Sequence, residues 1–89
     1  MEKGKNETYK SNKIFLRVIA DMSPNRLVFP QKIIWEDGRE FIIQKVTDVR
    51  RQFVAEIGEH CTKYYCVIDG RFKVLCLNDD MRWFVLTAK

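Results

Sequence analysis

The chain has 89 residues, of which 46% are hydrophobic, 12% aromatic and 31% charged. This length fits one domain with a small core and little room for a deep substrate cavity, and the composition is too apolar for a disordered chain. The formal net charge of +4 favours anionic partners, but 16 basic residues are offset by 12 acidic ones, and the sequence contains no dense basic run.

Residues 1–12 are polar and rich in lysine, and we expect a flexible tail there, followed by a single small β domain over residues 13–89. The segment lacks the apolar run of a signal peptide, and every apolar stretch is far shorter than the roughly 20 residues that span a membrane. We therefore expect a cytoplasmic protein.

The first half of the domain predicts strands. Alternating apolar residues indicate a strand from Ile14 to Ala20, turn-forming residues follow over 21–26, and Pro30 marks the start of the next strand. Asp37-Gly38 then lies between two apolar runs and predicts a hairpin, because a tight turn needs positive φ.

A two-residue loop at Asp37-Gly38 would place Glu36 opposite Arg39, Trp35 opposite Glu40 and Ile34 opposite Phe41. Both faces of this hairpin are apolar. We therefore expect it to be covered on both sides, or to change face at a bend as strands do when a small barrel closes.

Residues 46–57 fit two patterns. Val46, Val49, Phe53 and Ile57 recur at the spacing of one helix face, and Gly58 could end such a helix. The favoured interpretation is one bent strand from Phe41 to Val49, a break at residues 50–52 and a short extended piece over 53–57. A short helix stays open as the alternative.

Asp69-Gly70 predicts a second hairpin, whose register the sequence leaves open. A two-residue loop groups Tyr65, Val67, Phe72, Val74 and Cys76 on one apolar face, whereas a three-residue loop with a glycine bulge groups Tyr64, Cys66, Ile68, Phe72, Val74 and Cys76. Residues 78–81 predict a third turn before a last strand over 82–86. The expected fold is all-β, a single small antiparallel barrel or strongly bent sheet of five to six strands.

The three cysteines, Cys61, Cys66 and Cys76, cannot all pair within the chain, and we expect them to be reduced and buried. With the only histidine, His60, they make a set of four soft zinc ligands. Their spacing fits no zinc knuckle, and Cys61 and Cys66 would point to opposite faces of a strand. We expect no metal and no cofactor.

An ordered set of motifs runs from Pro30 to Leu86. It contains Trp-Glu-Asp-Gly-Arg at residues 35–39, Thr-Asp-Val-Arg at 47–50, a tyrosine-rich hairpin and Arg-Trp-Phe-Val at 82–85. This set resembles a family of small uncharacterised bacterial proteins, common in Gram-positive anaerobes, that carry a W-E-D-G-R hairpin and a C-terminal R-W-F-V strand. Residues 52–62 depart from the family's pattern, since they are apolar where Gly-rich polar sequence is expected. The resemblance implies no established activity.

Catalysis is not expected, because no nucleophile, base and orienting group can be assembled from these residues. His60 and Cys61 are adjacent and would point to opposite faces of a strand. Only four glycines are present, and they form no phosphate-binding loop. The sequence therefore predicts that the protein is not an enzyme.

Basic and aromatic residues alternate along the predicted strands, a combination with which small barrels bind single-stranded nucleic acid. The simpler interpretation is that the rings form the core and the cations its solvated back. Candidate residues for binding a single-stranded nucleic acid or an acidic protein are Arg39, Arg50, Arg51, Lys63, Tyr65, Arg71, Lys73 and Arg82. The alternative is a protein-interaction or homodimerising domain, and no small-molecule substrate or membrane partner is implied.

Overall fold

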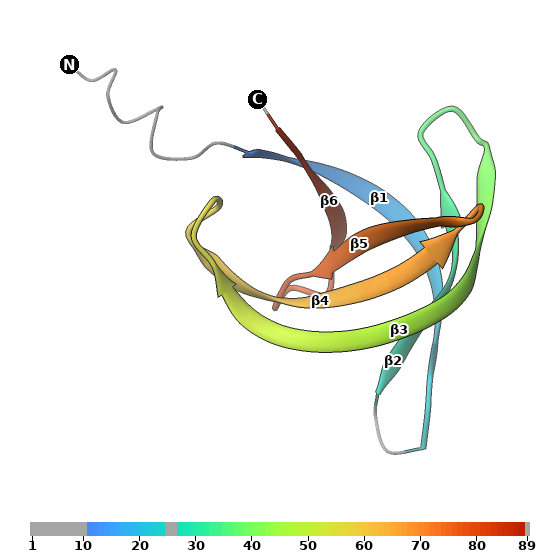
Figure 1. The fold of residues 1–89 in the computed structure, drawn as a ribbon, viewed down its shortest axis with the longest axis horizontal. Helices are drawn as coiled ribbons and strands as arrows, with labels where there is room; N and C mark the ends of the chain where they lie inside the picture. The colour runs from blue at the N-terminus through green and yellow to red at the C-terminus, as the bar shows by residue number, and fades with distance from the viewer. Residues whose placement is uncertain (1–10, 25–26, 89) are drawn as a thin grey trace.

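The computed structural model describes residues 11–24 and 27–88, which form six antiparallel strands. Each strand pairs with the next along the chain, and the last pairs with the first, so the sheet closes into a barrel (Figure 1). The strands are β1 (Ser11–Met22), β2 (Val28–Ile34), β3 (Glu40–Val54), β4 (Glu59–Ile68), β5 (Arg71–Leu77) and β6 (Trp83–Ala88). The expected all-β barrel is confirmed. Among the described residues there is no helix long and apolar enough to cross a membrane.

β1 is longer than the sequence predicts at both ends. It begins at Ser11, opposite Ala88 of β6, and the rest of the expected tail lies outside the described residues. Pro30 of β2 is buried and faces Ala20, where the register of β1 and β2 shifts. Proline has no N–H to donate to the ladder, which explains why the irregularity falls at this point.

The first hairpin has a three-residue loop over residues 36–38, so the expected two-residue loop is wrong. The Trp35 N–H donates to the Arg39 carbonyl at 2.8 Å, and the Gly38 N–H donates to the Trp35 carbonyl at 2.9 Å. Gly38 has a φ of +91°, as in a type I turn followed by a glycine bulge. The Asp37 carboxylate accepts hydrogen bonds from the backbone N–H and the Nε of Arg39, and both bonds favour the longer loop.

The extra loop residue changes every cross-strand pair of this hairpin. Ile34 faces Glu40 and Ile33 faces Phe41, so the expected pairs of Ile34 with Phe41 and of Glu36 with Arg39 are wrong. The cross-strand ion pair of the hairpin joins Lys32 to Glu40 at 3.0 Å. Ile33 is buried in consequence, on the face that lines the barrel.

β3 runs without interruption from Glu40 to Val54, so the break expected at residues 50–52 is wrong, and so is the helical alternative. Irregularities in the pairing with β4, between Ile43 and Lys45 and between Val46 and Asp48, accompany the bend that Figure 1 shows as a long arc beside β4. Val49 and Phe53, two of the four residues with helix-like spacing, are exposed, so that spacing does not mark a buried face.

The second hairpin has the two-residue loop. Ile68 faces Arg71, and Asp69 and Gly70 have φ angles of 54° and 74°, as in a type I′ turn. The group that contains Phe72 and Val74 shares one face, as this register predicts, but that face is the outside of the barrel, since Phe72 is 80% exposed.

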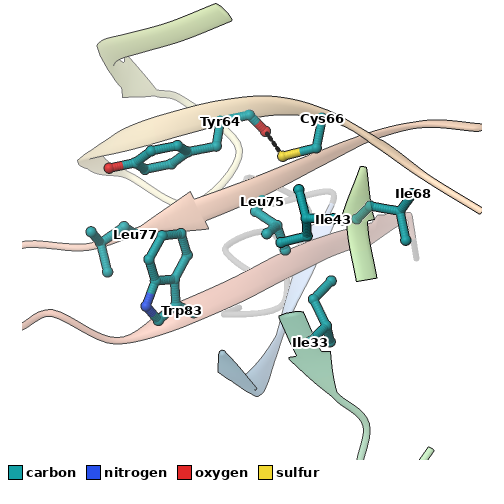
Figure 2. Close-up of a cluster of buried hydrophobic side chains, with 8 residues drawn as sticks. All are labelled: Ile33, Ile43, Tyr64, Cys66, Ile68, Leu75, Leu77 and Trp83. Atoms are coloured by element: carbon teal, nitrogen blue, oxygen red, sulfur yellow. Dashed lines mark hydrogen bonds between the residues drawn. The ribbon is translucent and has the colours of Figure 1, made fainter. Parts of the chain in front are cut away.

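The barrel is filled by side chains from five strands, shown in Figure 2: Ile33, Ile43, Tyr64, Cys66, Ile68, Leu75, Leu77 and Trp83. The Tyr64 and Trp83 ring centroids are 5.1 Å apart. The Cys66 thiol donates to the Tyr64 carbonyl at 3.4 Å. This interior core includes residues from both predicted hairpins.

A second, smaller cluster packs on the outer face of the sheet and contains Val54, Cys61, Cys76 and Phe84. Cys76 lies between Leu75 and Leu77 along β5, and adjacent strand residues point to opposite faces, so both faces of this strand end are buried. An ion pair between Lys13 and Glu59 joins the start of β1 to the β3–β4 hairpin next to this cluster.

Candidate binding site

The barrel is closed by a short ladder between β5 and β6. Only two residue pairs form it, Cys76 with Phe84 and Leu77 with Trp83. Beyond Phe84, β6 follows β1, where Val85 faces Ile14. Residues 71–75 of β5 and 85–88 of β6 therefore form no ladder with each other, and Figure 1 shows the two strands diverging.

A cavity of about 760 Å³ occupies this divergence. Its lining includes residues 71–76 of β5 and residues 85–87 of β6, while Trp35, Arg39 and Phe41 line it from the first hairpin. A strand that presents one face to a cavity contributes every second residue. A lining of consecutive residues shows that the cavity follows the edge of β5. We call this cavity the β5–β6 opening.

The backbone of β5 has an unpaired edge in the β5–β6 opening. In a two-residue hairpin the closing pair, here Ile68 and Arg71, exchanges both backbone hydrogen bonds, and every second residue along β5 repeats this pattern with β4. Phe72 and Val74 are the intervening residues, so their N–H and C=O groups point away from β4. In the part of the chain that the structure describes, no strand pairs with them on that side.

The charges around the β5–β6 opening are mostly positive. Lys63, Arg71 and Lys73 line it and form no ion pair with any described carboxylate, and Asp69 is the one carboxylate among the lining residues. Arg39 also lines it, but its Nε lies 2.7 Å from Asp37. Three cations with free hydrogen-bonding capacity therefore surround an unpaired strand edge.

The β5–β6 opening brings together five of the eight predicted binding residues: Arg39, Lys63, Tyr65, Arg71 and Lys73. Arg50 and Arg51 lie outside it, and each is held by a carboxylate, Asp48 at 2.7 Å and Asp79 at 2.9 Å. These bonds lower the pKa of both carboxyl groups. Their charges are therefore already matched.

Arg82 also lies outside the β5–β6 opening. Its guanidinium stands over the Phe15 ring, 3.9 Å from the ring centroid, and it lines a second cavity of about 620 Å³ next to Trp83. A cation over a ring at this distance is attracted by the ring's negative face. The contact with Phe15 holds the Arg82 guanidinium in place but leaves its positive charge without a negatively charged partner.

Sequence reasoning missed Trp35, Phe41 and residues 85–87, because their position beside β5 depends on how the barrel closes. A signal existed for β5 itself. Arg71 and Lys73 occupy the positions that alternate with Phe72 and Val74, on the face that Leu75 and Leu77 bury further along the strand. Cations on a core-facing strand face indicate an end of the barrel that is not fully covered.

The soft zinc ligands considered above are separated by the fold. Cys66 lies in the interior core, whereas Cys61 and Cys76 lie in the outer cluster. All three thiols are free and buried, and burial raises the pKa of Cys66 to about 11 and that of Cys76 to about 12. The His60 ring packs on Phe53 with 5.1 Å between centroids. Within residues 11–24 and 27–88, no group of three or more His, Cys, Asp or Glu residues could hold a metal ion.

The chain matches no known protein-family model, no curated protein and no solved structure. The resemblance based on the W-E-D-G-R and R-W-F-V motifs stays a prediction. The geometry of the β5–β6 opening is therefore the basis for a functional proposal.

Proposed function

We propose that this protein is a non-catalytic, cytoplasmic binding module that holds an acidic protein segment in the β5–β6 opening. The observation that carries the proposal is the set of three cations, Lys63, Arg71 and Lys73, that line one cavity without a carboxylate partner among the described residues. The buried free thiols support a reducing compartment.

Free cations favour an anionic ligand because they need not give up an existing partner. Arg50 would lose its hydrogen bond to Asp48 before it could bind a ligand carboxylate, whereas Arg71 and Lys73 have no such bond to break. Arg50, Arg51, Arg71 and Lys73 are all exposed, so the difference between these paired and free cations lies in their partners and not in their access to solvent.

The test compares two double variants that remove the same charge. Arg71→Ala with Lys73→Ala should weaken binding of a fluorescein-labelled Glu-Val-Glu-Val-Glu-Val-Glu-Val peptide about tenfold, the effect of losing two exposed ion pairs. Arg50→Ala with Arg51→Ala lowers the net charge equally and should leave Kd nearly unchanged. Equal weakening by both pairs would mean that net charge alone attracts the peptide, and would contradict the proposed site.

Single-stranded nucleic acid is the second candidate ligand, and one observation favours it. Phe72 is 80% exposed on the outer face next to Val67, and the register places Tyr65 one pair further along this face with Lys63 beyond it. Rings of this kind stack on bases while cations contact phosphates. Titration with a fluorescent dT oligonucleotide at low and moderate salt tests it. Binding of the oligonucleotide with a steep salt dependence, and none of the peptide, would favour nucleic acid over the acidic segment.

A further inference from the structure

We propose that the acidic segment binds as an added β-strand along the unpaired edge of β5, with residues of alternating acidic and apolar character. This inference rests on the proposed function and adds how the segment is held. An extended chain that adds to a sheet edge gains main-chain hydrogen bonds, and its alternate side chains are selected by the two faces of the sheet.

The backbone of β5 supplies the hydrogen-bonding groups. Phe72 and Val74 direct their N–H and C=O groups into the β5–β6 opening, and Cys76 uses the same edge to pair with Phe84 of β6. A ligand strand beside Phe72 and Val74 would therefore continue a ladder that β6 begins. It would occupy the place from which β6 diverges toward β1.

The side chains of β5 set the pattern of the ligand. Residues opposite one another on paired strands point to the same face of the sheet. Ligand residues opposite Arg71 and Lys73 would lie beside these cations, so carboxylates are favoured there. Those opposite Phe72 and Val74 would lie on the outer face beside two exposed apolar side chains, so apolar residues are favoured. This alternation holds for either direction of the ligand strand.

A second copy of this chain is a poorer occupant of the same edge. Two β5 strands paired antiparallel about Phe72 would set Arg71 against Lys73 of the other copy, and paired about Lys73 they would set the two Lys73 side chains opposite each other. Like charges directly opposite one another destabilise a sheet. Charge complementarity therefore selects an acidic segment.

The first experiment tests the alternation. The labelled peptide Glu-Val-Glu-Val-Glu-Val-Glu-Val is compared with Glu-Glu-Glu-Glu-Val-Val-Val-Val, which has the same composition and charge. Addition of a strand to β5 predicts a Kd about tenfold lower for the alternating peptide, since only it presents carboxylates to one face and apolar side chains to the other. Equal affinities would overturn the alternation while leaving an acidic ligand in place.

The second experiment removes one main-chain donor. Val74→Pro deletes an N–H that points into the β5–β6 opening, and a proline is tolerated on a strand edge that makes no ladder hydrogen bond. We expect it to weaken binding of the alternating peptide about tenfold. Val74→Ala, the matched control, keeps the N–H and loses the side chain, so it should bind more tightly than the proline variant. Equal binding by the two variants would overturn the added strand.

The third measurement uses the unmodified protein, so it does not depend on the folding of a variant. Adding the alternating peptide should slow hydrogen exchange at the Phe72 and Val74 amides, because each gains a main-chain partner. Peptide binding with exchange at these amides unchanged would refute the added strand and leave the proposed function standing. An absence of peptide binding, with Phe72 still exchanging fast, would refute both proposals.

Discussion

Met81 occupies a backbone position that suits glycine. In the third turn the Asn78 N–H donates to the Arg82 carbonyl and the Met81 N–H to the Asn78 carbonyl, both at 3.0 Å, which repeats the hydrogen bonds of the first turn. Gly38 fills the corresponding position there, whereas Met81 has a φ of 63° with an exposed side chain. A non-glycine residue at positive φ stores strain.

Met81→Gly should therefore raise the free energy of unfolding by about 0.5–1 kcal/mol, the strain relieved less the added entropy of glycine in the unfolded chain. Urea denaturation of the purified protein measures it. Met81→Ala is the control, since it removes the side chain and keeps the strain. If both variants gained equally, the methionine side chain rather than the backbone would be responsible.

The buried thiols predict a loss of stability in alkali. Burial raises the pKa of Cys66 from 9.0 to about 11 and that of Cys76 to about 12, so the folded state holds these protons more tightly than the unfolded chain. Their contribution is complete below about pH 9 and declines as the pH rises toward 11 and 12.

The midpoint of urea denaturation, measured between pH 8 and pH 11, should accordingly fall on the alkaline side of about pH 9. Cys66→Ala provides the comparison. It removes one of these groups, so its midpoint should start lower and decline less steeply with pH. A wild-type midpoint that stayed level up to pH 11 would show that the thiolates are tolerated in the folded core.

The two Asp-Gly pairs show how far local sequence determines an element. Both hairpins were predictable, because each pair lies between apolar runs and supplies positive φ. The loop length was not, because an Asp-Gly pair is compatible with a two-residue and with a three-residue loop, and the two loops differ in the side chains that bond to them. Asp37 bonds to Arg39 across its loop, whereas Gly70 donates its N–H to the side-chain oxygen of Gln44 on β3, 2.8 Å away. Gln44 is too distant in sequence to be read as part of that turn.

Sequence periodicity also failed to predict that β3 is one continuous strand. Periodicity assumes that a strand keeps one face to the core, and two bulges in β3 break that assumption. Val46 packs against the interior core, whereas Val54 belongs to the outer cluster. A single strand that serves two cores on opposite faces gives a pattern that resembles neither a regular strand nor a helix.

The edge of β5 predicts an alternating exchange pattern in the free protein. The amides of Lys73 and Leu75 bond to β4 and should exchange slowly with solvent deuterium. The amides of Phe72 and Val74 point into the β5–β6 opening and should exchange fast. Amide-resolved NMR exchange checks this. Protection of all four amides would mean that another part of the chain or a second copy already covers this edge.

Closure of the whole molecule depends on a few residues at one end of β6. β6 is paired to β1 over six residue pairs but to β5 over two, so the junction between β5 and β6, called the β5–β6 seam below, is the weaker of the two. Sequence patterns predicted the strands and a barrel or bent sheet. They could not place this seam, because it arises from where β6 turns away from β5 toward a strand at the other end of the chain. The sequence therefore predicted which types of residue form the candidate binding site, but not where in the fold they come together.

Phe84 holds this seam from the outer face. It pairs with Cys76 on β5, its ring centroid lies 5.7 Å from that of Phe15 on β1, and it is fully buried. It therefore joins three strands at the point where the barrel closes. The free energy of unfolding of a protein of this size is only about 5–15 kcal/mol, so the loss of such a side chain removes a large fraction of it.

Phe84→Ala should lower the free energy of unfolding by about 3–5 kcal/mol, the usual effect of removing a buried phenylalanine, with further opening of the β5–β6 seam. Phe72→Ala is the matched control on the neighbouring strand. Phe72 is 80% exposed, so the same chemical change should alter stability by less than about 0.5 kcal/mol. Thermal and urea denaturation of both variants give the comparison. If the two substitutions had similar effects, the outer cluster would contribute little, and closure would depend on the interior core and the ladder from β6 to β1.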